Sequence, residues 1–364
     1  MSATARGEFS LSDSIRPEAQ TAAVSAQSIL DIRDLRVEYM TPKGPARAVD
    51  GVSLSLAPGE IFGLAGESGC GKSTIAHAIM RLIKDPGFIT GGSISFRGQN
   101  VLAMSRSELR HFRWSKVALV SQSAMNALNP VTSVGSQMID AMSAHERISR
   151  SQARKRAAEL FELVGIDPRR LRSFAHQLSG GMRQRAMIAM ALALNPDVLI
   201  MDEPTTALDV VVQRDILQQI EDLQARFGFA ILFITHDLSL LVEISTRIAV
   251  MYAGQLIEIA PAGELLDNPL HPYTLGLMNS FPSVEGDQGR LEGIPGSPPD
   301  LVSPPRGCRF NPRCPRCVPG NEPLYRLQTT VRPVLQEVTP GHWVACHLYP
   351  AAAGTHPSLA GARA

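Results

Sequence analysis

Residues 66–73 read GESGCGKS, in full Gly66, Glu67, Ser68, Gly69, Cys70, Gly71, Lys72 and Ser73. An apolar run at residues 61–64 precedes this segment, and a run of helix-forming residues at 72–84 follows it. The glycines let backbone N–H groups curl around phosphate oxygens, and the start of the helix adds a partial positive charge. A loop of this pattern between a strand and a helix predicts binding of a nucleoside triphosphate.

The side chains of this loop have separate expected roles. Lys72 is expected to reach the β- and γ-phosphates, and Ser73 is expected to ligate Mg²⁺. Cys70 is assigned no chemistry of its own. The predicted nucleotide-binding residues of the loop are Gly66, Glu67, Ser68, Gly69, Cys70, Gly71, Lys72, Ser73 and Thr74.

Two kinds of hydrophobic pattern predict the sheets. Short, nearly all-apolar runs are typical of parallel strands covered on both faces, and they occur at residues 61–64, 198–201, 230–234 and 248–251. Alternating apolar and polar residues are typical of half-exposed strands, and they occur at residues 29–39, 49–56 and 93–96. The sequence therefore predicts an α/β core with an antiparallel β edge sheet.

Composition and charge exclude several classes of protein. The 35 Lys and Arg residues nearly balance the 34 Asp and Glu residues, so the sequence predicts no nucleic-acid partner. No uninterrupted apolar stretch of about 18 residues occurs, so the chain is not expected to span a bilayer by itself. Residues 1–28 lack the apolar core of a secretory signal, and we interpret them as a flexible tail retained in a cytoplasmic protein.

Two adjacent carboxylates follow the apolar run at residues 198–201. Asp202 and Glu203 are expected at the carboxyl end of a parallel strand, where open α/β sheets place their ligands. Adjacent residues of a strand point to opposite sides, so the two acids can have different roles. Asp202 suits the Mg²⁺ shell, and Glu203 suits a base that orients the attacking water.

A second glycine-containing segment lies shortly before these carboxylates and reads Leu178, Ser179, Gly180, Gly181, Met182, Arg183 and Gln184. It resembles the signature motif of the ATP-binding cassette (ABC) family. The resemblance implies a P-loop NTPase fold, with a cassette domain over residues 29–270 and a helical signature subdomain over residues 122–194. It also implies a head-to-tail dimer with an identical or homologous ATPase, whose bound ATP would receive Ser179, Gly180 and Gly181 at its γ-phosphate.

Four further positions match the family in its order. The resemblance implies that Tyr39 stacks on adenine, and a strand aromatic packed in the edge sheet is the alternative. Gln122 matches the loop glutamine that contacts Mg²⁺ or the attacking water and signals toward the membrane subunits. Asp209 resembles the residue that crosses the dimer interface, or it caps a helix. His236 matches the histidine that contacts the γ-phosphate.

The resemblance thus assigns two overlapping sets of residues. The implied catalytic residues are Glu203, His236, Gln122 and Lys72. The residues implied for Mg²⁺ are Ser73, Gln122 and Asp202.

The C-terminal part narrows the resemblance to one branch of the family. A resemblance to the oligopeptide and dipeptide import branch is carried by residues 124–130, 271–274 and 294–301. The expected extension covers residues 271–350, and a flexible tail follows at 351–364. Eight prolines between residues 293 and 320 predict that the extension is a small irregular appendage.

Four cysteines of this appendage indicate a metal or cluster site, namely Cys308, Cys314, Cys317 and Cys346. Four thiolates suffice for a [4Fe-4S] cluster or for a tetrahedral Zn²⁺ site. The branch usually has a longer gap between its second and third cysteines, and His342 and His347 lie near Cys346, so zinc competes with the cluster. Reduced structural thiols are the third interpretation.

Together these features predict the ATP-binding and ATP-hydrolysing subunit of an ABC transporter that energises import of peptides or related solutes. The resemblance implies ATP and Mg²⁺ as cofactors, and two transmembrane permease subunits, a second ATPase and an extracytoplasmic solute-binding protein as partners. It implies a peripheral position at the cytoplasmic face of the inner or plasma membrane. The alternatives are a soluble ABC ATPase of DNA repair or translation, and a nucleotide-gated regulatory module.

Overall fold

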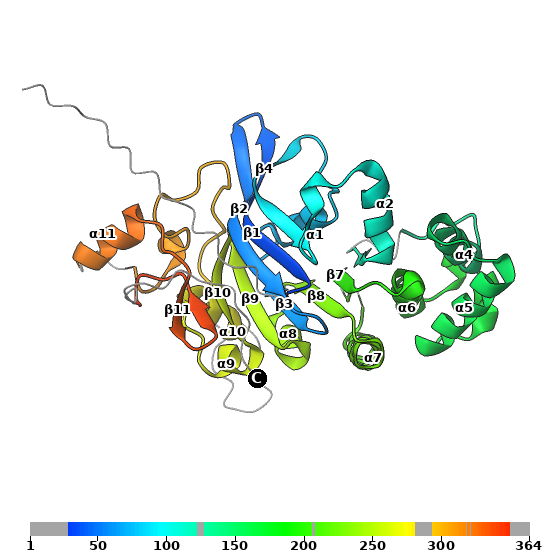
Figure 1. Cartoon of the computed structure of the whole chain (residues 1–364). Helices are drawn as coiled ribbons and strands as arrows, with labels where there is room; N and C mark the ends of the chain where they lie inside the picture. Colours follow the sequence, from blue (N-terminus) through cyan, green and yellow to red (C-terminus); the bar gives the residue numbers. More distant parts are fainter. Residues whose placement is uncertain are drawn as a thin grey trace, which may run out of the picture.

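The fold is given by a computed structural model that describes residues 28–121, 127–205, 208–280, 293–317, 319–320 and 322–349. Two sheets form its centre, while α4 (Val134–His145) and α5 (Arg150–Leu163) lie at one end and α11 (Glu322–Thr330) lies at the other (Figure 1). The predictions for Gln122 and for nearly all of the two tails lie outside the described residues. Within the described part of the chain, no helix is long and apolar enough to cross a membrane.

The larger sheet contains the parallel strands that the sequence predicts. Five neighbouring strands are parallel in the order β9-β3-β8-β7-β6, with bounds Arg247–Tyr252, Ile61–Ala65, Ala230–Thr235, Val198–Asp202 and Val117–Val120. Successive residues of β7 pack on opposite faces, because Leu199 and Met201 belong to one apolar core and Ile200 belongs to the other. Both faces of this sheet are therefore covered, as its apolar runs predict.

The smaller sheet is antiparallel and covers one face of the larger sheet. Its strand order is β2-β1-β4-β5, with bounds Gly44–Leu56, Leu30–Thr41, Gly87–Phe96 and Gln99–Asn100. Val37 of β1 and Val52 of β2 share a core with Phe62 of β3. This sheet is the predicted antiparallel edge sheet.

Helices α7 (Val210–Phe227) and α8 (Leu238–Ile244) cover the opposite face of the larger sheet. Apolar residues of α7 recur at helical spacing, so one stripe of this helix is buried, formed by Ile216, Leu217, Ile220 and Leu223. In α8 the buried residues are Leu238, Leu241 and Ile244.

Residues 66–73 form what we call the phosphate loop, and helix α1 (Lys72–Ile79) begins within it. The helix ends earlier than the predicted Lys84. The chain turns to a left-handed conformation at Arg81, with φ of 48°. The Arg113 guanidinium donates hydrogen bonds to the carbonyls of Met80 (2.9 Å) and Arg81 (2.7 Å). An arginine from α2 (Arg106–Ser115) thus donates hydrogen bonds to the carbonyls at the end of α1. These carbonyls therefore do not need the N–H groups of a further helical turn.

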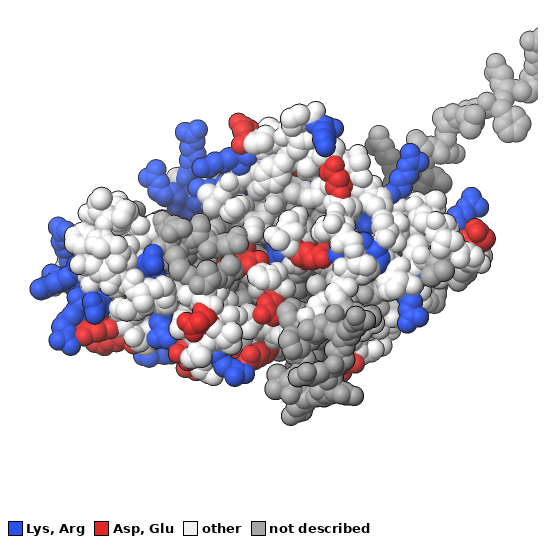
Figure 2. All heavy atoms as spheres, turned by 180° about the vertical axis from the view of Figure 1, so that it is seen from behind, with Lys and Arg blue, Asp and Glu red and all other residues white. Residues whose placement is uncertain are grey.

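Helices α4, α5 and α6 (Gly180–Ala191) form what we call the helical region, residues 127–194. The side chains of Ser133, Ser149 and Ser179 accept backbone hydrogen bonds at the starts of these three helices. Short 3-10 helices complete the region at Pro168–Arg172, Ala175–Gln177 and Leu192–Leu194. Figure 2 shows Lys and Arg side chains gathered at this end of the molecule, although the charges of the whole chain nearly cancel.

The C-terminal extension, residues 271–349, is more regular than the sequence predicts. Residues 293–320 contain only a 3-10 helix, Asn311–Arg313, among their described part, as the prolines predict. The prediction of an irregular appendage is wrong for residues 322–344, which form α11 and a hairpin of β11 (Gln336–Thr339) and β12 (His342–Val344). Pro323 is compatible with α11 because it lies in the first turn, where its missing N–H is not needed.

The hairpin joins the extension to the core. β10 (Gln255–Pro261) pairs with β9 on one side and with β12 on the other, both antiparallel. The larger sheet therefore has eight strands, and its last two come from the extension. Helices α9 (Ala262–Asp267) and α10 (Pro272–Met278) connect β10 to the rest of the extension.

Candidate nucleotide and magnesium site

The phosphate loop lies between β3 and α1, at the carboxyl edge of the parallel strands. Gly66 has φ of 148°, and a Cβ placed there would lie 2.2 Å from the Met251 carbonyl oxygen. Gly71 has φ of 110°, and a Cβ placed there would lie 2.0 Å from the Ala48 carbonyl oxygen. These two positions require glycine, because the curved loop touches the backbone of β9 and of β2.

Lys72 is the first residue of α1, and its side chain reaches back across the loop. Its Nζ donates hydrogen bonds to the carbonyl oxygens of Gly66 (2.6 Å) and Glu67 (3.0 Å), and only 5% of the residue is exposed. A shielded ammonium beside the N-terminus of a helix is a binding site for phosphate oxygens. The loop therefore fits the predicted triphosphate.

Ser73 and Asp202 meet beside the loop. Ser73 Oγ donates a hydrogen bond of 3.0 Å to Asp202 Oδ1. Asp202 is 3% exposed, and this burial raises the pKa of its carboxyl above the ordinary value. A hydroxyl and a carboxylate side by side supply the hard oxygen ligands that Mg²⁺ prefers, so these residues fit the predicted ion.

Glu203 has a different partner from Asp202, as the sequence predicts for adjacent strand residues. Its Oε2 lies 2.9 Å from His236 Nδ1, at the carboxyl ends of β7 and β8. Its backbone is left-handed, with φ of 51°, and its N–H donates to the Ile234 carbonyl at 2.8 Å. A residue other than glycine pays for this conformation, and such strain is typical of functional sites.

Ser179 and Asp209 each cap a helix of this chain. Ser179 Oγ accepts from the Met182 N–H (3.2 Å) at the start of α6, and an Asp209 oxygen accepts from the Val212 N–H (2.9 Å) at the start of α7. A Cβ on Gly181 would lie 2.8 Å from Val212 Cγ1, so this glycine lets the two helices approach closely. The contacts of Ser179 and Asp209 with a second subunit stay predictions.

Tyr39 lies on β1, opposite Ala46 of β2 and Gly87 of β4. Its ring covers Gly87, where a Cβ would lie 2.6 Å from Tyr39 Cε1. The ring packs against the core of the smaller sheet and is only half-buried. This packing agrees with the alternative interpretation of Tyr39 as an aromatic residue packed in the edge sheet. The stacking of Tyr39 on adenine stays a prediction.

The C-terminal extension also reaches the phosphate loop, which the sequence did not reveal. Arg313 donates hydrogen bonds to both carboxylate oxygens of Glu67, at 2.7 and 3.0 Å, and Tyr273 Oη accepts from the Glu67 N–H at 2.9 Å. These partners are 246 and 206 residues apart, so no local pattern connects them. The one signal in the sequence is Glu67 itself, because an acid in a loop that binds anions is expected to need a basic partner.

The structure does not support the metal site predicted at the cysteines of the extension. Cys308, Cys314 and Cys346 line one small cavity of about 10 Å³. Burial raises the pKa of Cys308 to about 12 and the pKa of Cys346 to about 11. In the described ranges, no group of three or more His, Cys, Asp or Glu side chains can hold a metal ion. A [4Fe-4S] cluster or Zn²⁺ site that also includes Cys317 is therefore not supported.

Comparison with protein families gives two matches along the chain. A family model described as ABC transporter matches residues 49–206, which include the phosphate loop, the signature segment and the two carboxylates. A model described as the C-terminal region of oligopeptide/dipeptide transporters matches residues 257–320.

Individual relatives cover most of the chain. A probable peptide ABC transporter ATP-binding protein of Sinorhizobium fredii is 46% identical over 325 residues, 88% of this chain and 95% of the relative. An oligopeptide transport ATP-binding protein of Bacillus subtilis is 45% identical, over 78% of this chain and 80% of the relative. A solved dimeric ATP-binding cassette in a post-hydrolysis state with ADP and Pi is 27% identical, with a TM-score of 0.58 over 64% of this chain and 98% of that one.

Proposed function

Because this chain belongs to the ATP-binding subunits of ABC transporters, we propose that it hydrolyses ATP to energise peptide import through separate permease subunits. The peptide cargo is supported by the names of the relatives and by the match of residues 257–320. One observation carries the chemistry: three parallel strands bring Lys72, Ser73, Asp202, Glu203 and His236 to one edge of a sheet. The matches lend no support to a role in DNA repair or translation, or to a purely regulatory module.

The loop side chains are proposed to bind the triphosphate. Lys72 exchanges its two carbonyl acceptors for phosphate oxygens, and the N-terminus of α1 contributes backbone N–H groups. Ser73 and Asp202 would hold Mg²⁺, together with Gln122. When bound, this ion offsets the negative charge that the phosphates carry.

Glu203 and His236 are proposed to act on the water and on the γ-phosphate. The Glu203 carboxylate accepts a hydrogen bond from the attacking water and orients it for in-line attack. The contact of 2.9 Å with His236 holds the carboxylate in place, and the half-exposed imidazole is free to turn toward the phosphate. Bond breaking then releases ADP and inorganic phosphate.

A second ATPase is proposed to complete each site. The γ-phosphate would be approached across the interface by the second subunit's Ser179, Gly180 and Gly181. Asp209 would lie at this interface, and Tyr39 would stack on the adenine of the ATP bound to its own chain. The dimeric cassette among the solved structures supports this arrangement. The further proposed partners are two permease subunits and, on the other side of the membrane, a solute-binding protein, so the chain acts at the cytoplasmic face.

Replacing Glu203 tests this function. Glu203→Gln is expected to lower kcat for ATP hydrolysis by about 10²–10⁴-fold, because the amide is no base, and to leave the Kd for ATP within about threefold. Phosphate release at saturating ATP measures the first effect, and nucleotide titration measures the second. Glu243→Gln on α8 is the control, since this exposed acid lies in a surface ion pair of 3.7 Å with Arg214. Wild-type turnover in Glu203→Gln would remove Glu203 from this role.

A further inference from the structure

The C-terminal extension holds the one acidic side chain of the phosphate loop. We propose that Arg313 is a positioning residue that neutralises Glu67, and that the extension thereby sets the affinity of the loop for ATP. This inference rests on the proposed function, since it concerns the same nucleotide site. It assigns to the extension a direct effect on the ATPase cycle, separate from any contact with permease or cargo.

The geometry of the pair is that of a specific charge contact. Both terminal nitrogens of Arg313 face both carboxylate oxygens of Glu67, at 2.7 and 3.0 Å, in the two-pronged arrangement that strengthens arginine–carboxylate pairs. The Arg313 side chain is 5% exposed and the Glu67 side chain is 26% exposed. Such a pair is worth more than a surface ion pair because water screens it less.

Arg313 is held in place from three sides. Its Nε donates to the Pro295 carbonyl at 2.7 Å, and its Nη1 lies 3.3 Å from Tyr252 Oη. Its guanidinium carbon lies 5.8 Å from the centre of the Tyr252 ring and 6.0 Å from that of Phe310. The guanidinium is therefore oriented before any nucleotide binds, and it presents a fixed positive charge to Glu67.

The extension also fixes the backbone of Glu67. Tyr273 is fully buried, and its hydroxyl accepts the Glu67 N–H at 2.9 Å. The Glu67 carbonyl in turn accepts from Lys72, the residue proposed to bind the phosphates. The extension thus touches the side chain and the N–H of a residue whose carbonyl is bound to the central lysine of the site.

The charge of Glu67 explains why the loop needs this partner. ATP brings several negative charges to the loop, and an unpaired carboxylate there would repel them. Two unit charges about 10 Å apart at an effective dielectric constant of about 20 change an equilibrium constant by roughly tenfold or more. Arg313 removes this repulsion, so its loss is expected to weaken ATP binding rather than the chemical step.

Arg309 provides a matched control from the same segment. It is also 5% exposed, and it pairs with Asp50 of β2 and with the Ala253 carbonyl, away from Glu67. A variant at either arginine loses a buried pair between the extension and the core. Only the variant at Arg313 changes the charge of the phosphate loop.

Equilibrium titration of the full chain with ATP and EDTA tests the inference. Arg313→Ala is expected to raise the Kd for ATP about tenfold, and Arg313→Lys is expected to raise it less. The double variant Glu67→Gln with Arg313→Ala is expected to bind within about twofold of Glu67→Gln alone, because the repelling charge is gone. Arg309→Ala is expected to lower the Tm and to leave the Kd within about twofold.

Steady-state kinetics with Mg²⁺ give a second readout. Arg313→Ala is expected to raise KM for ATP and to leave kcat within about threefold of wild type. If the double variant binds ATP as weakly as Arg313→Ala, the pair is only structural and the inference is overturned. If wild type binds ATP and Arg313→Ala binds it equally well, the inference alone fails, whereas a wild-type chain that binds no ATP refutes the proposed function.

Discussion

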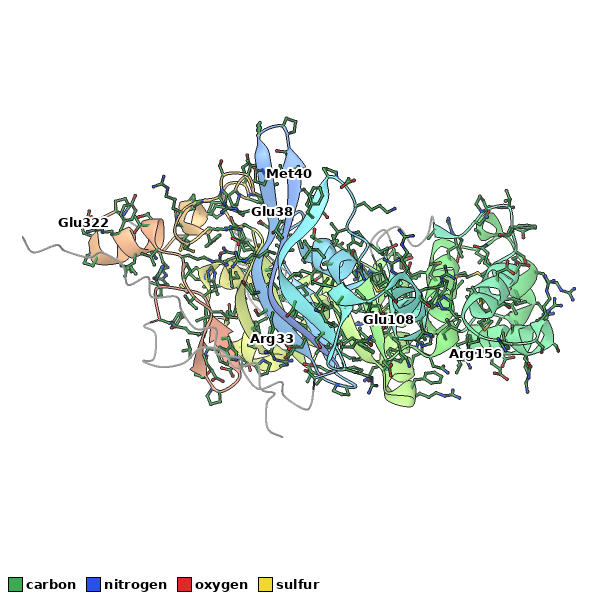
Figure 3. The ribbon with its side chains drawn as sticks, turned by 45° about the horizontal axis from the view of Figure 1, so that its top comes forward. Arg33, Glu38, Met40, Glu108, Arg156 and Glu322 are labelled. Atoms are coloured by element: carbon green, nitrogen blue, oxygen red, sulfur yellow. The ribbon has the colours of Figure 1, made fainter. Side chains whose placement is uncertain are left out.

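The helical region and the C-terminal extension flank the same core at opposite ends, where Figure 3 labels Arg156 on α5 and Glu322 on α11. The two regions are joined to that core by different interactions. Among the described residues of 127–194, Gln184 is the one buried polar side chain. In the described part of the extension, seven polar or charged side chains are buried, namely His271, Thr274, Arg309, Arg313, Gln328, Gln336 and His342.

Apolar packing joins the helical region to the core. Met138, Ala157 and Phe161 are fully buried, and they belong to the same apolar cluster as Leu199 of β7 and Ile231 of β8. Apolar burial stabilises without a preferred direction. The position of the helical region therefore depends on shape and volume, and we expect it to respond little to changes in charge.

Ion pairs and a buried carboxylate–histidine contact join the extension to the core. Each of three acids in the strands or the phosphate loop meets basic side chains of the extension: Asp50 meets Arg309 and Arg332, Glu67 meets Arg313, and Glu258 meets His342. Such pairs are directional, and removing one partner leaves the other with fewer compensating contacts. The extension is therefore the region whose position depends more on charge and pH.

Replacing Glu258 is expected to destabilise the attachment of the extension strongly. Glu258 is fully buried and accepts hydrogen bonds from the N–H groups of Leu270 (2.6 Å) and His271 (2.9 Å), and His342 Nε2 lies 2.7 Å away. Glu258→Ala is expected to lower the free energy of unfolding by about 3–5 kcal/mol, because two buried polar groups and one part-buried N–H lose their partner. Urea unfolding followed by the fluorescence of Trp343, which lies on β12, measures this loss in a Trp114→Phe background.

Phe161→Ala is the matched change in the helical region. It removes a fully buried ring and is expected to cost a similar 3–5 kcal/mol, roughly, through the cavity it leaves. Glu258→Gln keeps an acceptor oxygen and is expected to cost less than Glu258→Ala. A loss below about 1 kcal/mol in Glu258→Ala would show that apolar contacts hold the extension too, and the contrast between the regions would disappear.

Acidification is expected to lower the free energy of unfolding by about 3 kcal/mol through His271 of the extension. Burial lowers the pKa of His271 to about 4, although the nearby Glu258 carboxylate acts in the opposite direction. The unfolded chain protonates this histidine near its ordinary value of about 6.5, so it holds more protons than the folded chain between pH 6.5 and pH 4. The free energy of unfolding should therefore fall as the pH drops through this window.

Trp343 fluorescence in urea at a series of pH values measures this slope, and His271→Gln should reduce it, leaving the smaller part due to His145, whose pKa burial also lowers. Burial tends to raise the pKa of Asp50, but Arg332, Arg309 and Arg36 outweigh burial and hold that pKa below 3.8. The stability that Asp50 contributes is thus lost only at still lower pH, outside the window. An equal slope in wild type and His271→Gln would assign the pH dependence to another group.

The sequence predicts the nucleotide site better than the extension, for a physical reason. Lys72 and Ser73 belong to a local pattern, Asp202 ends one buried strand, and Glu203 and His236 directly follow buried strands. Parallel strands that carry such residues at their carboxyl ends must bring them to one edge. The fold therefore follows from hydrophobic patterns, and the fold places these side chains together.

The contacts of the extension had no comparable signal. Glu67 and Arg313 are 246 residues apart, and Glu258 and His342 are 84 residues apart, with no repeat or spacing that relates them. The strand β12 has only three residues, too few for a hydrophobic period to be recognised. The end of α1 was missed likewise, since Arg113 binds its last carbonyls from another helix.

Two serines of the helical region allow helix capping to be distinguished from catalysis, and the expected differences are small. Ser179 and Ser149 cap α6 and α5 alike, with each Oγ accepting a backbone N–H, from Met182 at 3.2 Å and from Gln152 at 3.3 Å. Replacement of either serine by alanine is expected to cost about 1 kcal/mol of stability. Ser179→Ala alone should also lower the rate of phosphate release at saturating ATP, by about tenfold, because only Ser179 is proposed to serve the nucleotide of the partner. Equal rates of phosphate release in both variants would show that Ser179 acts only as a helix cap. The proposed effect on nucleotide binding would then be confined to the extension.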